Sequence, residues 1–95
     1  MDPIIRGVLE QSLDSQLTEE SLQINFKLYK TFKDENLIDS IESAMISQIY
    51  TKLVLFYFMM ENVNEISVTD DMELVQMFFS RSQIIKTRIR EVCNL

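Results

Sequence analysis

The sequence predicts an all-α protein, a small bundle of about four helices with a long, very apolar third helix. One Gly and one Pro in 95 residues leave few of the turn residues on which β-hairpins and glycine-rich loops depend. Apolar residues recur at helical spacing through most of the chain. A hydrophobic fraction of 46% is typical of a globular protein, and this length suits a single domain, residues 1–95.

The first helix is predicted to begin at Asp2-Pro3. Asp can cap free backbone amides, and Pro is tolerated at the first helical position, where its missing N–H would have no partner. Gly7 is expected to weaken this short helix by about 1 kcal/mol relative to Ala. The apolar residues at helical spacing are Ile4, Ile5, Val8, Leu9 and Leu13.

A second helix is predicted to start after Thr18, a good capping residue that is followed by two glutamates. Acidic side chains suit the positive end of the helix dipole. The helix is expected to end near residues 34–36. Its inward stripe is predicted to hold Leu22, Phe26, Tyr29 and Phe32.

The third helix is predicted to run from Leu37 to about Asn62, with Asn36 as its cap, although no Gly or Pro forces a break from the second helix. From Leu53 to Met60 the sequence LVLFYFMM has eight apolar residues in succession. Each residue advances about 100° around a helix, so this run is apolar on every side. A strand of eight residues is the alternative, but the stripe that leads into the run favours a helix. That stripe is Ile38, Ile41, Met45, Ile49 and Leu53.

The segment Glu61 to Thr69 is predicted to be a loop, and Thr69 to cap a fourth helix with Asp70 and Asp71 in its first turn. This helix is expected to continue without a break to about Val92. Its inner face is predicted to hold Val75, Phe78 or Phe79, Ser82, Ile85, Ile89 and Val92.

Composition argues against several classes of function. The net charge of −6 disfavours a general nucleic-acid surface. A single cysteine, Cys93, favours a reducing compartment, the cytoplasm or the nucleus. The start of the chain has no pattern of a secretory signal peptide. The most apolar window, Ala44–Met60, has only 17 residues and carries Lys52, so no membrane span is expected.

No catalytic or metal-binding motif is present. The chain has no His, and one Cys and one Gly exclude a zinc cluster and a phosphate-binding glycine loop. Adjacent acid pairs such as Asp70-Asp71 lie at expected helix starts, where capping accounts for them. We therefore expect no enzymatic activity, no cofactor, no metal and no small-molecule substrate.

The order of a short helix, a helix of about 27 residues, the segment ISVTDD and a further helix resembles a histone fold over about Ser21 to Ser80. That resemblance implies a nucleic-acid-associated regulator. The sequence departs from the family in two respects. An acid typically falls three residues after the threonine, where this chain has Met72, and the composition is acidic.

The apolar run is larger than one small core can use, since soluble monomers rarely expose large apolar patches. Either the first helix covers its far side or another chain does, and we favour another chain, alone or together with the first helix, as a homodimer or in a heteromeric complex. The hypothesis is a non-catalytic interaction subunit or adaptor; a small acidic helical chaperone is an alternative. The predicted interface residues are Leu55, Phe56, Phe58, Met59, Met60, Phe78 and Phe79.

A basic patch near the C-terminal end of the fourth helix offers a second candidate site. The dipole of a helix favours cations there, which accounts for the patch without any partner. Docking of an acidic partner is the alternative, and a basic helix could also serve a nucleic-acid-associated regulator. The residues of this patch are Arg81, Lys86, Arg88 and Arg90.

Overall fold

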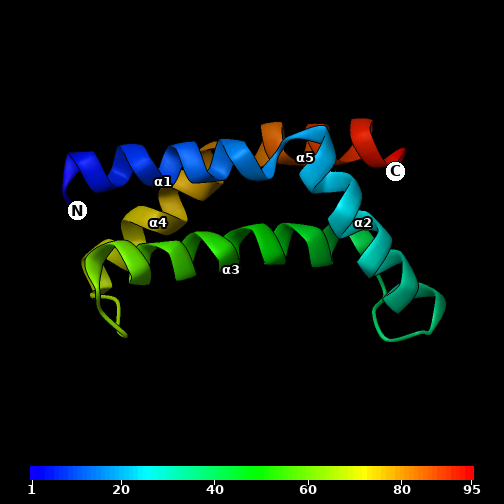
Figure 1. Cartoon of the computed structure of the whole chain (residues 1–95), viewed down its shortest axis with the longest axis horizontal. Helices are drawn as coiled ribbons and strands as arrows, with labels where there is room; N and C mark the ends of the chain where they lie inside the picture. Colours follow the sequence, from blue (N-terminus) through cyan, green and yellow to red (C-terminus); the bar gives the residue numbers. More distant parts are fainter.

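A computed structural model describes all residues, 1–95, and consists of five α-helices without a strand (Figure 1). The predicted all-α class is confirmed, and the apolar run 53–60 is helical. The helices are α1 (Pro3–Gln16), α2 (Glu19–Asp34), α3 (Ile41–Glu61), α4 (Val68–Ser80) and α5 (Ser82–Cys93).

The five helices form an elongated bundle built around α1 and α3. These two helices lie side by side and run in opposite directions, and α2 crosses one end of the pair (Figure 1). On the far side in this view, α4 leads from the end of α3 back toward α1, and α5 packs against α2 and α3. The radius of gyration is 14.1 Å, above the about 12 Å of a compact domain of this size. An elongated shape leaves more of each helix exposed.

Side-chain caps begin four of the helices. Asp2 Oδ1 accepts the N–H of Ile4 at 2.7 Å, and Thr18 Oγ1 accepts the N–H of Ser21, so both predicted caps are confirmed. The other two predictions were wrong. Ser40, not Asn36, caps α3, and Ser67, not Thr69, caps α4. In each case the serine directly before the helix accepts, through its hydroxyl oxygen, a hydrogen bond from the backbone N–H three residues later.

Asn36 has a different role from the predicted one, because it ends α2. Its φ is +61°, a left-handed conformation that the sequence-based prediction did not consider, and Ile38 therefore lies in the loop before α3. The N–H of Leu37 then donates to the carbonyl of Phe32 at 2.9 Å, the bond that closes a Schellman motif. Asn62 ends α3 and Asn94 ends α5 in the same way. Asparagine tolerates this conformation, so the chain ends its helices without glycine.

The predicted fourth helix is two helices, which raises the number from about four to five. The chain turns at Arg81, whose N–H donates to Phe78 O at 3.1 Å in place of the usual bond four residues back. The hydroxyl of Ser80 donates to Met77 O at 2.7 Å, the carbonyl that the N–H of Arg81 would bond in a continuous helix. This turn lets α5 pack against α2 and α3.

The core draws side chains from all five helices. Of the apolar run in α3, only Leu53 and Tyr57 are buried. In α4, Phe78 takes the inner position and Phe79 is exposed. The buried hydrophobic residues are Leu9, Leu13, Leu22, Met45, Ile49, Leu53, Tyr57, Leu74, Met77, Phe78, Ile85, Ile89 and Cys93.

Candidate protein-interaction surfaces

Three residues of the apolar run in α3 are exposed: Leu55 and Met59 on the side away from the core, and Met60 near the end of the helix. We call them the methionine face. Met59 is the most open of the three, with 75% of its surface exposed. The half-buried neighbours Phe56 and Phe58 pack against the core and flank this face. The five α3 residues predicted at an interface therefore lie on or beside one exposed apolar area.

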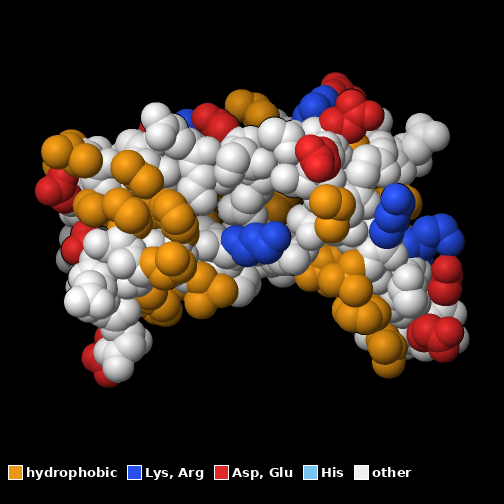
Figure 2. Space-filling view, in the orientation of Figure 1, with side chains coloured by type: hydrophobic (Ala, Val, Ile, Leu, Met, Phe, Trp, Pro, Cys, Tyr) orange, Lys and Arg blue, Asp and Glu red, His pale blue; other side chains and the backbone are white.

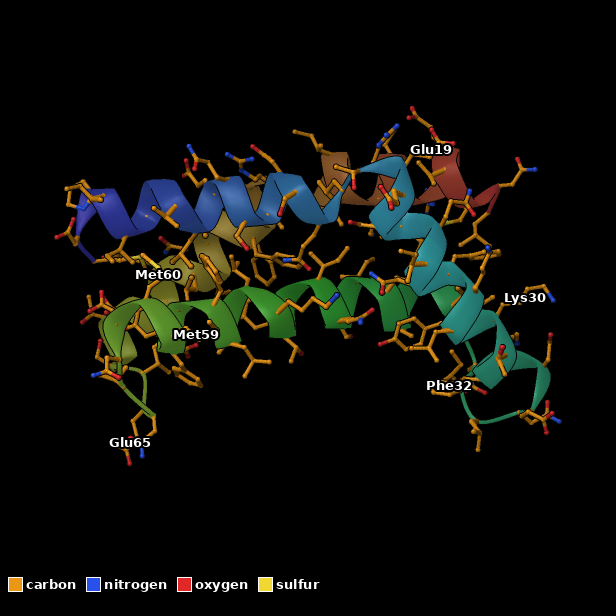
Figure 3. All side chains as sticks on the ribbon, viewed as in Figure 1. Glu19, Lys30, Phe32, Met59, Met60 and Glu65 are labelled. Carbon is orange, nitrogen blue, oxygen red and sulfur yellow. The ribbon has the colours of Figure 1, made fainter.

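The methionine face lies beside the first turns of α1. Figure 2 shows hydrophobic side chains gathered over the N-terminal end of α1 and the C-terminal end of α3. Figure 3 places Met59 on the outside of α3 and Met60 on the side toward α1. α1 packs along α3 but leaves this surface open, so the first helix does not cover the far side of the apolar run.

By length and composition alone, α3 is long and apolar enough to cross a membrane. Its most apolar 18-residue window has a mean hydropathy of 1.2, and 22% of that window is buried within the molecule. The core helix of a soluble protein can be equally long and apolar, but it is then mostly buried. Lys52 is exposed on this helix, three residues before Leu55.

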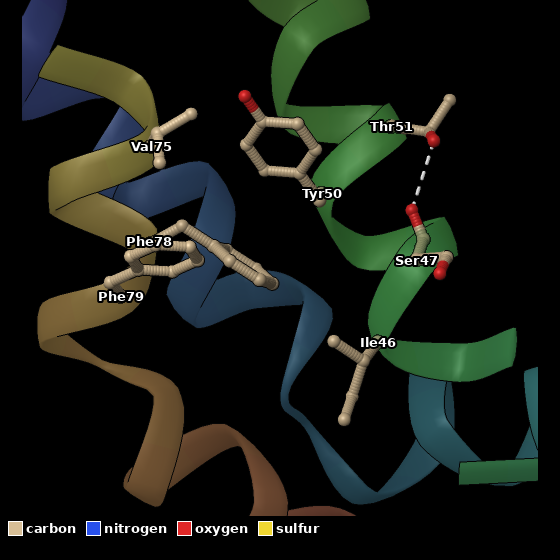
Figure 4. Close-up of a pocket in the computed structure, with 7 residues that line it drawn as sticks. All are labelled: Ile46, Ser47, Tyr50, Thr51, Val75, Phe78 and Phe79. Atoms are coloured by element: carbon tan, nitrogen blue, oxygen red, sulfur yellow. Dashed lines mark hydrogen bonds between the residues drawn. The ribbon is translucent and has the colours of Figure 1, made fainter. Parts of the chain in front are cut away.

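A second apolar surface lies between α3 and α4. It is a groove of about 380 Å³ whose seven lining residues carry no charge (Figure 4). Phe78, which is 7% exposed, forms the floor of the groove. Its ring packs edge-on against the ring of Tyr50, with the two centroids 5.1 Å apart. The groove is lined by Ile46, Ser47, Tyr50, Thr51, Val75, Phe78 and Phe79.

Phe79 stands at the edge of this groove with 68% of its surface exposed. Val68, Met72 and Val75 precede it at intervals of four, three and four residues, the spacing of a single helix face. We call these four residues the α4 stripe. Val68 and Met72 are more than half exposed. The sequence-based prediction placed Val75 on the inner face of the fourth helix and Phe79 either there or at the interface, and it did not connect them with Val68 and Met72, although the spacing is visible in the sequence.

The groove and the methionine face are separate surfaces. Tyr50 and Met59 are nine positions apart on α3, which places them about 180° apart around the helix axis. Of the two phenylalanines predicted at the interface with the α3 residues, Phe78 is buried beneath the groove and Phe79 is exposed at its edge. The residues predicted as one interface are thus divided between two sides of the molecule.

The basic patch is largely engaged within the molecule. The guanidinium of Arg81 lies 2.7 Å from Asp14 and 3.7 Å from Glu10 of α1. Arg88 donates to Leu17 O at 2.9 Å, and Arg90 lies 3.0 Å from Glu42 of α3. Lys86 alone forms no ion pair. These arginines connect α5 and the α4–α5 turn to the rest of the bundle.

A polar cluster joins α3 to the start of α4. The Tyr57 hydroxyl donates to Asp70 Oδ2, and this hydrogen bond raises the pKa of Tyr57 to about 12 and lowers the pKa of Asp70. The amino group of Met1 lies 3.3 Å from Asp70 and 3.1 Å from Glu73. These contacts hold α1, α3 and α4 together. No group of three or more Cys, Asp or Glu side chains has the arrangement of a metal site.

Comparison of the chain with protein-family models, curated proteins and solved structures finds no match. The resemblance to the histone fold therefore gains no support from these comparisons.

Proposed function

We propose that this protein is a non-catalytic interaction subunit that buries apolar helix faces against a partner chain in a larger assembly. The supporting observation is the methionine face on the long, apolar helix α3, where Met59 is 75% exposed although the run around it is continuously apolar. Methionine is flexible and polarisable, so it suits a surface that adapts to another protein. The role of the chain is to position or stabilise that partner.

The balance between buried and exposed apolar residues supports this proposal. Thirteen hydrophobic residues form the core, and thirteen large hydrophobic residues are exposed. The accessible surface is 6175 Å², above the about 5,700 Å² of a typical monomer of 11.2 kDa. Isolated exposed hydrophobic residues are ordinary, but contiguous ones mark interaction sites.

The competing hypothesis, a nucleic-acid-associated regulator, would use the basic patch. Three of the four basic residues already contact groups within the molecule, so a phosphate backbone would have to displace Asp14, Glu10 or Glu42. The net charge of −6 adds repulsion at long range. A protein partner on the methionine face requires no such rearrangement.

A photo-crosslinking experiment tests the proposal directly. A photoreactive amino acid replaces Met59 in one variant and Lys30, an exposed residue of α2, in a matched control, and each is irradiated in native cell extract. We expect one discrete crosslinked protein from position 59 and none from position 30. Crosslinks to lipid alone, or no crosslink from position 59, would contradict the proposal.

A further inference from the structure

We propose that the groove between α3 and α4 binds a second copy of this chain, with Phe79 of each copy inserted into the groove of the other. This inference rests on the proposed function, and it names the partner for the surface opposite the methionine face.

The surface is complementary to itself. Phe79 projects from α4 directly beside a groove of about 380 Å³, so one surface carries both a protruding ring and a hollow that can receive one (Figure 4). A two-fold axis brings the same patch of both copies together, and each residue pair then occurs twice. One rotation therefore fills both grooves. A different partner would need both a protruding side chain that fills the groove and a separate pocket that receives Phe79.

The apolar area is what a stable dimer of ordinary size requires. Val68, Met72 and Phe79 are each more than half exposed, and Ile46 and Tyr50 of the groove are half-buried. Taking side chains of this size as roughly 150–200 Å² gives on the order of 400–500 Å² of open apolar surface. A standard interface buries about 800 Å² per partner, of which roughly 60% is apolar. The α4 stripe and the groove together supply that share.

The charge around the groove is compatible with a second copy. None of the seven lining residues is charged, so two copies meet without burying an unpaired ion. Burial of Tyr50 and, after it, the nearby Asp71 carboxylate raise the pKa of Tyr50, and the side chain of Asp71 is exposed. Each copy carries a net charge of −6, so added salt screens their repulsion and is expected to tighten the pair.

The test is the mass of the isolated chain by sedimentation equilibrium at about 100 μM protomer, above the micromolar Kd that an interface of this size supports. We expect twice 11.2 kDa for the unaltered chain. Phe79→Ala removes the protruding ring and Ser47→Trp fills the groove, and each is expected to sediment as a monomer. Ile84→Ala changes an exposed residue of α5 and is the control, expected to stay dimeric.

Mixing the two monomeric variants gives the sharpest result. Phe79→Ala retains an open groove and Ser47→Trp retains the ring, so the mixture is expected to form a dimer with one of the two contacts. Circular dichroism of each variant checks that the helices are intact. A monomeric unaltered chain, dimeric single variants or a mixture that stays monomeric would overturn the inference. Crosslinking from Met59 to a different protein would still support the proposed function in that case.

Discussion

Asparagine carries much of the turn chemistry of this chain at the scale of single residues. With one glycine in the sequence, three helices end on asparagines whose φ lies between +53° and +61°. A side chain with a β-carbon is strained there unless it is Asn or Asp, whose short polar groups bond locally. The chain has few glycines, and at these three helix ends asparagine adopts the left-handed conformation that glycine usually adopts.

Replacement of Asn62 tests that conformation. Asn62→Ala is expected to lower the free energy of unfolding by about 1 kcal/mol. The left-handed conformation strains alanine, which has no polar side chain to offset that strain by a local hydrogen bond. Asn62→Gly is expected to change it by less than about 0.5 kcal/mol. Urea unfolding followed by circular dichroism measures both. Equal losses in the two variants would contradict the assignment of φ at this residue.

At the scale of the helix, α3 combines a core stripe with an exposed apolar side. Leu53 is fully buried and Leu55, two residues later, is exposed, although both have the same side chain. The run from Leu53 to Met60 is apolar in every direction and cannot separate them, but the stripe that leads into it continues to Leu53 and not to Leu55. Their difference in burial is set by the positions of α1, α2 and α5 around α3.

Alanine at these two positions separates their roles. Leu53→Ala is expected to destabilise the fold by about 2–5 kcal/mol, because it leaves a cavity in a packed core. Leu55→Ala is expected to cost less than about 0.5 kcal/mol in the isolated chain. Urea midpoints of the two variants provide the measurement. A loss at Leu55 as large as the loss at Leu53 would show that the methionine face is core in solution.

The contact between α3 and α4 predicts a specific dependence of stability on pH. Folding raises the pKa of Tyr57 from 10 to about 12. The contribution of Tyr57 to the free energy of unfolding is therefore full below pH 10 and is lost as pH rises toward 12. Folding lowers the pKa of Asp70 from 3.8. The contribution of Asp70 to the free energy of unfolding is therefore full above pH 3.8 and is lost as pH falls through the pKa that Asp70 has in the folded state.

Tyr57→Phe removes the Tyr57–Asp70 hydrogen bond and its dependence on pH. The difference in unfolding free energy between the unaltered chain and this variant is expected to be largest near neutral pH and to shrink between pH 10 and 12. Tyr29→Phe is the control, because the Tyr29 hydroxyl forms no hydrogen bond within the molecule. A Tyr57 difference that stays constant from pH 8 to 12 would refute the assignment.

For the molecule as a whole, the sequence predicts the fold class and most of the core but not the division of its surfaces. Helical spacing placed Leu22, Met45 and Ile85 on inner faces, and all three are buried. The break at Arg81 was missed: its local sign, a serine whose hydroxyl competes for the last carbonyls of α4, is weak in the sequence, and the ion pairs of Arg81 with Asp14 and Glu10 join residues far apart in the chain. The same tertiary arrangement puts the methionine face and the α4 stripe on opposite sides of α3.

Oxidation of methionine by dilute peroxide, read by mass spectrometry in native extract, tests the central claim that both surfaces are covered by other protein chains. Oxidation follows exposure, and the methionines sample each region: Met59 the methionine face, Met72 the α4 stripe, Met45 and Met77 the core. We expect Met59 and Met72 to be as protected as the two core residues in extract, and to react quickly in the diluted, isolated chain. Rapid oxidation of Met59 and Met72 in extract, with the core residues protected, would contradict the claim.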